Sequence, residues 1–248
     1  MSVVGLVSPG EMGGAVGAAL TATGHTVQWA SEGRSAETRE RAERAGLSDA
    51  GTLEALARTS EILLSVCPPQ FALDTAAAVS GFSGLYVDAN AVAPASAASV
   101  AELVEAAGAS YVDGGIIGPP PLEPGSTRLY LSGAGAPAVA ELFAGSVLDA
   151  HVIGDERTAA SAIKMAYAGW TKGSAALLLA MREAAERLGV GDELEAEWRL
   201  SQPGLAERYA AAAASREEKG WRWSPEMREI AATLEAAGLP AGFHEAAA

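Results

Sequence analysis

Lysine is rare in this chain of 248 residues, where only Lys164, Lys172 and Lys219 stand against fourteen arginines. Lys164 and Lys172 lie eight residues apart in the most apolar helical stretch, which puts both on one broad face of a helix. A partly desolvated lysine can give up its proton, whereas an arginine cannot. The pattern predicts that Lys164 transfers a proton and that Lys172 holds a substrate anion. The alternative is that both ammonium groups reach solvent from a buried helix.

A glycine-rich turn near the N-terminus, VSPGEMGG at residues 7–14, could bind phosphate. It follows the spacing Gly-x-Gly-x-x-Gly, with Ser8 first, Gly10 second and Gly13 third. A bare backbone lets a pyrophosphate approach, and the start of the next helix stabilises its charge. Serine suits the first position if its φ stays negative. A strand before and a helix after favour a dinucleotide site over a purely structural turn, with contacts from Ser8, Pro9, Gly10, Glu11 and Met12.

The segment SEGRSAETR, directly after the second expected strand, indicates which dinucleotide binds. An acidic residue that binds the ribose hydroxyl is typical of NAD sites, and Glu32 is present. The guanidinium of Arg34 and the hydroxyls of Ser31 and Ser35 suit a 2′-phosphate instead. We therefore expect NADP(H) rather than NAD. A solvated loop in which Ser35 caps the next helix is an alternative, compatible with the first.

The elements that must position these residues form two regions. Strands are expected at 2–8, 25–30, 61–67, 84–90, 109–117 and 128–133, and helices at 11–24, 35–46 and 95–108. Strands alternating with helices predict an α/β fold with a doubly wound parallel sheet, here a Rossmann domain over residues 1–155. Residues 156–248 are expected to form an all-α domain, with one long helix over 158–189. A helix of that length predicts packing against a second subunit, and hence a homodimer.

Composition excludes several classes of protein. The net charge of −14 argues against nucleic acid as a partner, so an anionic ligand must be held by local basic residues or backbone amides. No apolar run has the roughly 18 residues of a membrane span, and the N-terminus lacks the basic residues of a signal peptide. The single cysteine, Cys67, fits a reducing cytoplasmic location. Three scattered histidines make a metal site unexpected.

The sequence resembles the β-hydroxyacid dehydrogenase superfamily, which includes 6-phosphogluconate dehydrogenase, 3-hydroxyisobutyrate dehydrogenase and the imine reductases. The matching segments are VVGLVSPGEMGGAVGAALTATGHTV, YVDANAVAP, YVDGGIIGPP and AASAIKMAYAGWTKG, in the superfamily's order and spacing. The segments KMAYAGWTKGSAALLLA and GWRWSPEMREIAATLEAAGLP resemble a subgroup with a helical domain like that of phosphogluconate dehydrogenase. The resemblance covers nearly the whole chain. It implies a Rossmann domain, a helical domain, an active site between them, and a homodimer.

The resemblance also assigns roles, with some departures. Lys164 matches the catalytic lysine of a Lys-x-x-x-Asn motif, but Ala168 occupies the position of the asparagine, so that polar contact is lost. The neighbouring Tyr167 either replaces the lost contact or belongs to the core. Asn90 matches a loop residue near the nicotinamide, although it could instead shape a turn. A substrate-binding serine is replaced by Ile117, which leaves Gly118 to offer a backbone amide. Asp113 is expected to be structural. Cofactor contacts are completed by Cys67, a small buried group rather than a nucleophile, and by Pro68.

The C-terminal segment GWRWSPEM carries fewer indications. Trp221 and Trp223 are expected in a dimer core, Arg222 is a candidate anion anchor, and Ser224 with Pro225 could start a helix. Taken together, the sequence predicts an NADPH-dependent reductase or dehydrogenase acting on a small oxo or hydroxy compound. An imine reductase and a catalytically silent NADPH-binding protein remain alternatives.

Overall fold

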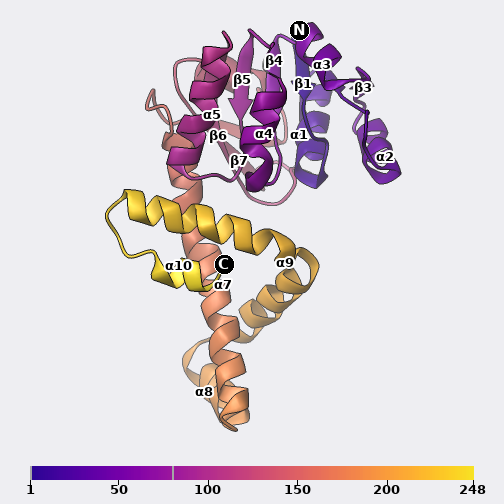
Figure 1. Cartoon of the computed structure of the whole chain (residues 1–248). Helices are drawn as coiled ribbons and strands as arrows, with labels where there is room; N and C mark the ends of the chain where they lie inside the picture. The colour runs from indigo at the N-terminus through magenta and orange to yellow at the C-terminus, as the bar shows by residue number, and fades with distance from the viewer. Residues whose placement is uncertain (1, 80) are drawn as a thin grey trace. The chain divides into compact units, whose positions relative to one another are not determined.

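The computed structural model describes residues 2–79 and 81–248 and contains two compact units, Met1–Met165 and Ala166–Ala248. We call them the sheet unit and the helical unit. The predicted order, an α/β part followed by helices, is confirmed (Figure 1). Helix α7, Ala159–Arg187, begins in the sheet unit and continues into the helical unit, so that Lys164 belongs to the sheet unit.

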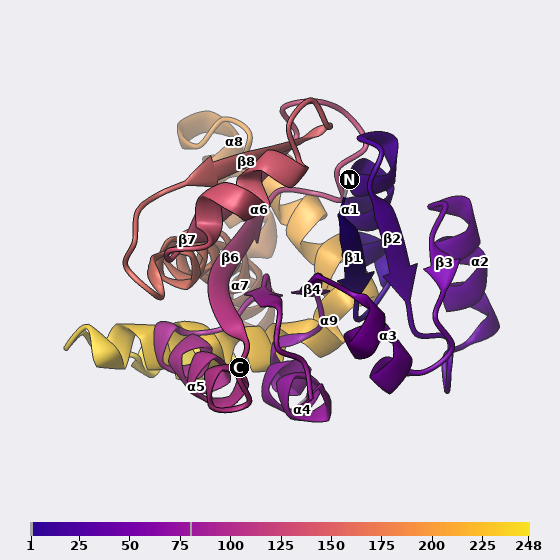
Figure 2. The ribbon, with the colours of Figure 1, turned by 90° about the horizontal axis from the view of Figure 1, so that it is seen from above.

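The sheet unit contains one eight-stranded sheet in the order β3-β2-β1-β4-β5-β6-β7-β8, which can be followed in Figure 2. Neighbouring strands are parallel except β6 and β7. The expected strands are present, but β3 and β8 were not predicted, because β3 has only two residues and β8 is largely exposed. The bounds are β1 Val3–Leu6, β2 Thr26–Trp29, β3 Ser48–Asp49, β4 Ile62–Ser65, β5 Leu85–Asp88, β6 Ser110–Ile117, β7 Thr127–Ser132 and β8 Leu148–Val152.

Helices cover both faces of this sheet, as a doubly wound fold requires (Figure 2). On one face α1 (Glu11–Ala22), α2 (Ala36–Arg44) and α6 (Ala136–Leu142) contribute to a core with Leu6, Leu20 and Leu129. On the other, α3 (Leu53–Thr59), α4 (Ala72–Ala78) and α5 (Pro94–Ala106) pack around Leu63, Tyr86 and Val100. A short 3₁₀ turn, Pro69–Phe71, precedes α4. Burial on both faces explains why the central strands are continuous apolar runs.

The helical unit contains the rest of α7 with α8 (Gly191–Ser201), α9 (Leu205–Ala236) and α10 (Gly242–Ala246). The prediction that Ser224 and Pro225 start a helix is wrong, because α9 begins at Leu205 and contains Pro225 in its interior. Proline has no amide to donate to the preceding turn, and Figure 1 shows α9 bending midway along its length. Over the described residues, every helix is too short or too polar to cross a membrane.

Candidate active site

The turn between β1 and α1 has the geometry of a phosphate-binding backbone. Gly10 is the N-cap of α1, and no side chain caps the helix there. A Cβ atom at Gly10 would meet nothing within 4 Å, whereas one at Gly13 would lie 2.1 Å from the carbonyl oxygen of Ser8. Packing therefore requires glycine at position 13 but not at position 10, where the backbone faces open space. No described non-glycine residue has a positive φ, so Ser8 meets the condition set by the sequence.

Arginine side chains surround this turn. The guanidinium groups donate hydrogen bonds to backbone carbonyls: Arg34 to Val7 at 3.2 Å and Arg41 to Pro9 at 3.3 Å. Arg39 donates to the carbonyl of Ser31, two residues after β2, at 2.7 Å. The sequence indicates Arg34 but not the other two, because residues 36–44 have the pattern of a polar surface helix. In the structure Arg41 also pairs with Glu37 of that helix. The sheet unit therefore has two guanidinium groups beside this turn.

The two serines after β2 already have partners within the chain. Ser35 is the N-cap of α2, and its hydroxyl accepts a hydrogen bond from the amide of Thr38 at 3.3 Å. Ser31 is buried, and the hydrogen bond from its side chain to Asp49 lowers the pKa of that exposed carboxyl. Ser35 thus has the capping role that the sequence allowed, while Ser31 holds Asp49 and, through its carbonyl, Arg39.

Asn90 connects the loops that follow β4 and β5. Its side chain is 2% exposed; Oδ1 accepts from the amide of Cys67 at 2.6 Å, and Nδ2 donates to Oγ of Ser65 at 3.0 Å. These bonds fix the backbone at Cys67, next to Pro68, which supports a turn-shaping role for the asparagine. Burial raises the pKa of the Cys67 thiol, as expected of a residue that is not a nucleophile.

Lys164 belongs to the first turns of α7, which pack against β6. A Cβ atom at Gly115 would lie 2.4 Å from the carbonyl oxygen of Ala160 and 3.0 Å from Cβ of Lys164, so the bare strand lets the helix pack closely. Strands β1, β4, β5 and β6 are parallel, so their carboxyl ends share one edge of the sheet. The β1–α1 turn, Asn90 and Lys164 therefore lie along this carboxyl edge. From β1 to β6 the distance is about 14 Å at the usual strand spacing.

The remaining predicted residues have other surroundings. Gly118 has a positive φ of 131°, and a Cβ atom there would lie 2.5 Å from the carbonyl oxygen of Ser126. Both features explain why this residue is glycine. Tyr167 is 47% exposed. In the helical unit, Nζ of Lys172 lies 2.7 Å from Glu226, a buried carboxylate that also contacts Nε of Arg222 at 3.3 Å. Lys172 and Arg222 thus share one carboxylate within the chain. Among the described residues, no group of histidine, cysteine and acidic side chains could hold a metal ion.

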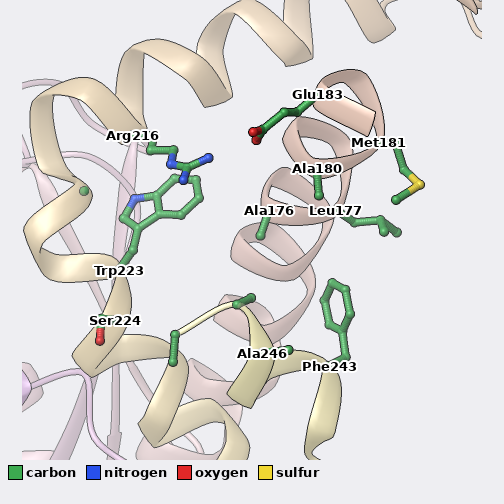
Figure 3. Close-up of a pocket in the computed structure, with 13 residues that line it drawn as sticks. Ala176, Leu177, Ala180, Met181, Glu183, Arg216, Trp223, Ser224, Phe243 and Ala246 are labelled. Carbon is green, nitrogen blue, oxygen red and sulfur yellow. The ribbon is translucent and has the colours of Figure 1, made fainter. Parts of the chain in front are cut away.

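The helical unit has a cavity of about 660 Å³ between α7, α9 and α10 (Figure 3). Trp223 and Arg216 line it from α9, Leu177 and Met181 from α7, and Phe243 from α10. Figure 3 shows the side chains of Arg216, from α9, and Glu183, from α7, pointing toward one another. None of the residues predicted to bind cofactor or to transfer a proton lines this cavity. Its walls are mostly apolar, which suits burial against protein better than binding of a charged cofactor.

Two sequence comparisons relate parts of the chain to known proteins. Residues 185–248 match a family described as a domain of unknown function, DUF1932. An uncharacterized 28.5 kDa protein of Methanothermus fervidus is 31% identical over 171 residues, which cover 68% of this chain and 65% of that protein. The chain thus spans about two thirds of the length of that relative.

Solved structures extend the comparison over the whole chain. A conserved protein of unknown function, described as similar to 3-hydroxyacid dehydrogenases, is 27% identical with a TM-score of 0.72, covering 99% of this chain and 96% of that one. 3-Hydroxyisobutyrate dehydrogenase from Salmonella typhimurium superimposes with a TM-score of 0.75 at 15% identity, over 100% and 92% of the chains. A reductive aminase from Aspergillus terreus, in complex with NADPH and ethyl levulinate, gives 0.61 at 22% identity, over 98% and 90%. The chain is structurally similar to the hydroxyacid dehydrogenase superfamily and to imine reductases, which confirms the resemblance found in the sequence.

Proposed function

We propose that the chain is an NADPH-dependent oxidoreductase that acts on a small oxo or hydroxy compound, with Lys164 as general acid and base. The observation that carries the proposal is that Lys164 lies at the same sheet edge as the uncapped start of α1 and the open backbone at Gly10. Ligands of doubly wound sheets bind at this edge, next to the point where the strand order reverses, here between β1 and β4. The fold shared with 3-hydroxyisobutyrate dehydrogenase and with an NADPH-bound reductive aminase supports the same class.

Each part of the edge has a task in this proposal. When bound, NADPH supplies the hydride that reduces the substrate carbonyl carbon. The amides at the start of α1 bind its pyrophosphate, and Arg34, with Arg41 next to the same turn, attracts its 2′-phosphate. Asn90 keeps the loop at Cys67 in place. Lys164 gives its proton to the carbonyl oxygen, so that the carbonyl becomes an alcohol, and removes that proton in the reverse direction.

We also propose a homodimer formed through the helical unit. Several large apolar side chains of this unit are exposed, among them Trp170 at 71%, Trp221 at 63% and Leu188 at 77%. An exposed apolar surface of this extent is typical of an interface, and an obligate one buries more than about 2,000 Å². Light scattering at micromolar concentration checks the proposal: the mass of a dimer is expected, and that of a monomer would contradict it.

The proposed activity is tested by binding and turnover together. NADPH and NADH are titrated into the protein, and NADPH absorbance is then followed with a panel of oxo acids, ketones and imines. Binding of NADPH and oxidation by a carbonyl compound support the proposal. Turnover confined to imines favours imine reduction instead, and NADPH binding without turnover across the panel favours a silent binding protein. Failure to bind NADPH overturns the proposal altogether.

A further inference from the structure

A buried carboxylate lies beneath the helix that carries Lys164. Asp113, in β6, is 0% exposed. Its Oδ2 accepts hydrogen bonds from the amide of Ser161 at 2.7 Å and from Oγ of Ser132 at 3.3 Å, and its Oδ1 accepts from Oγ of Ser161 at 2.6 Å. The hydroxyl of Ser132 in turn accepts from the amide of Ala160 at 3.1 Å. One carboxylate thus binds, directly or through one hydroxyl, two consecutive residues at the start of α7.

These contacts bind amides at the start of a helix. Helix α7 begins at Ala159, so Ala160 and Ser161 are its second and third residues. The amides at these positions have no partner inside a helix, and a side chain just before the helix usually binds one of them. Here the acceptors are Ser132 and Asp113, on β7 and β6. A negative charge at this end also interacts favourably with the helix dipole. The strands therefore fix where α7 begins.

We call these hydrogen bonds of Asp113 and Ser132 to the start of α7 the clamp. The clamp determines the position of Lys164 through two short, rigid segments of backbone. Along α7, Lys164 lies one turn after Ser161, about 4.5 Å further along the helix axis. Along β6, Gly115 lies two residues after Asp113 on the same face of the sheet, and its missing Cβ makes room for Ala160 and Lys164. A slip of the helix along the strand would break the bonds to Asp113 and push the backbone of α7 out of the space at Gly115.

We infer that Asp113 is a positioning residue for Lys164, which holds the start of α7 in register on β6 so that the ammonium group stays at the carboxyl edge. The inference rests on the function proposed above. It explains why an ionisable group is kept in the interior, although burial raises the pKa of Asp113 and the hydrogen bonds from Ser161 and Ser132 oppose that effect only in part. Burying a carboxyl group has a cost that a simple packing residue would avoid, and the hydrogen bonds of this one all lead to the start of one helix.

The test weakens these hydrogen bonds while the side chain of Asp113 remains. The double variant Ser132→Ala with Ser161→Ala removes both hydroxyl donors and keeps the carboxyl group and the amide of Ser161 in place. Ser174→Ala is the matched control, because this serine lies on the same helix and its hydroxyl donates to the carbonyl of Thr171 in that helix. The protein is labelled with ¹³C at the lysine ε-carbons. Three lysines give three signals, and Lys164→Met assigns the one of interest.

We expect the Lys164 signal of the double variant to move or split, while the signals of Lys172 and Lys219 stay in place and NADPH affinity changes by less than about twofold. With a substrate found in the panel, kcat should fall at least about tenfold with little change in KM, because small displacements of a catalytic group are costly. An unchanged Lys164 signal overturns the inference. If the parent protein turns over no substrate, the proposed function fails, but the spectra still decide the role of Asp113.

Discussion

Gly10 and Gly13 lie three residues apart in one turn, yet the structure predicts opposite outcomes when each is replaced by alanine. A methyl group at Gly10 points into open space, and the backbone angles there, φ −65° and ψ −171°, are accessible to alanine. Alanine also restricts the unfolded chain, a gain of about 0.4–1 kcal/mol. That gain offsets the roughly 0.5–1 kcal/mol by which glycine is a better N-cap than alanine. Gly10→Ala should therefore leave the free energy of unfolding within about 0.5 kcal/mol of the parent value.

The same methyl group occupies the space through which a pyrophosphate would approach the start of α1. We expect Gly10→Ala to raise the Kd for NADPH at least about tenfold, which corresponds to about 1.4 kcal/mol. Gly13→Ala is the matched comparison: its Cβ would lie 2.1 Å from the carbonyl oxygen of Ser8, so helix and turn must separate. Overpacking of this kind costs about 1–3 kcal/mol, and each kcal/mol lowers Tm by about 2–4 °C in a chain of this size.

Calorimetric titration with NADPH and thermal unfolding followed by circular dichroism measure both quantities on the same samples. We expect a stable Gly10→Ala protein with weak NADPH binding and a destabilised Gly13→Ala protein. Parent-like NADPH affinity in Gly10→Ala would refute the assignment of this turn as the phosphate site. A large loss of stability in Gly10→Ala would instead show that the space in front of the glycine is not open.

Two further predictions concern charge. Arg34→Ala should weaken NADPH binding by about 2 kcal/mol while leaving NADH binding nearly unchanged. The control Arg58→Ala changes an exposed arginine paired with Glu54 and should affect the binding of neither cofactor. Equal losses for both cofactors in Arg34→Ala would contradict a 2′-phosphate site. The pKa of Asp113 is raised in the folded protein from its ordinary value of 3.8, so between these two values the native state holds more protons than the unfolded state and stability falls as pH rises. Urea titrations at a series of pH values measure the free energy of unfolding of the parent and of Asp113→Asn. The parent should lose stability relative to this variant as pH rises through that window. A stability difference between the two proteins that does not depend on pH would show that Asp113 does not titrate as its burial implies.

The parts of the fold that sequence predicted are those with strong local signals. The central strands are apolar runs because they are buried on both faces, and the turn at Gly10 lies between a strand and a helix in the expected order. The two-residue β3 and the exposed β8 have no such signal. Pro225 was misread because a long helix can absorb a proline by bending, which depends on packing around it rather than on neighbouring residues.

The candidate site was predicted less completely, because its contacts join residues that are distant in sequence. Nothing near Arg41 indicates that its guanidinium binds the carbonyl of Pro9. Nothing near Lys172 indicates that Glu226 compensates its charge. Asp113 was expected to be structural, but its partner Ser161 is found only once α7 lies on β6. Composition can suggest such residues, as the rarity of lysine did for Lys164, but their pairing is set by the tertiary fold.

The most direct test of the account is the turnover of Lys164→Met, which removes the ammonium group and keeps an apolar side chain of similar length. General acids and bases typically contribute about 10²–10⁴-fold, so we expect kcat to fall at least about a hundredfold while the Kd for NADPH changes less than about threefold. Lys172→Met is the control, since its ammonium group is already paired with Glu226, and it should retain most of the turnover. Near-parent turnover of Lys164→Met on the substrate of the enzyme would contradict the central claim.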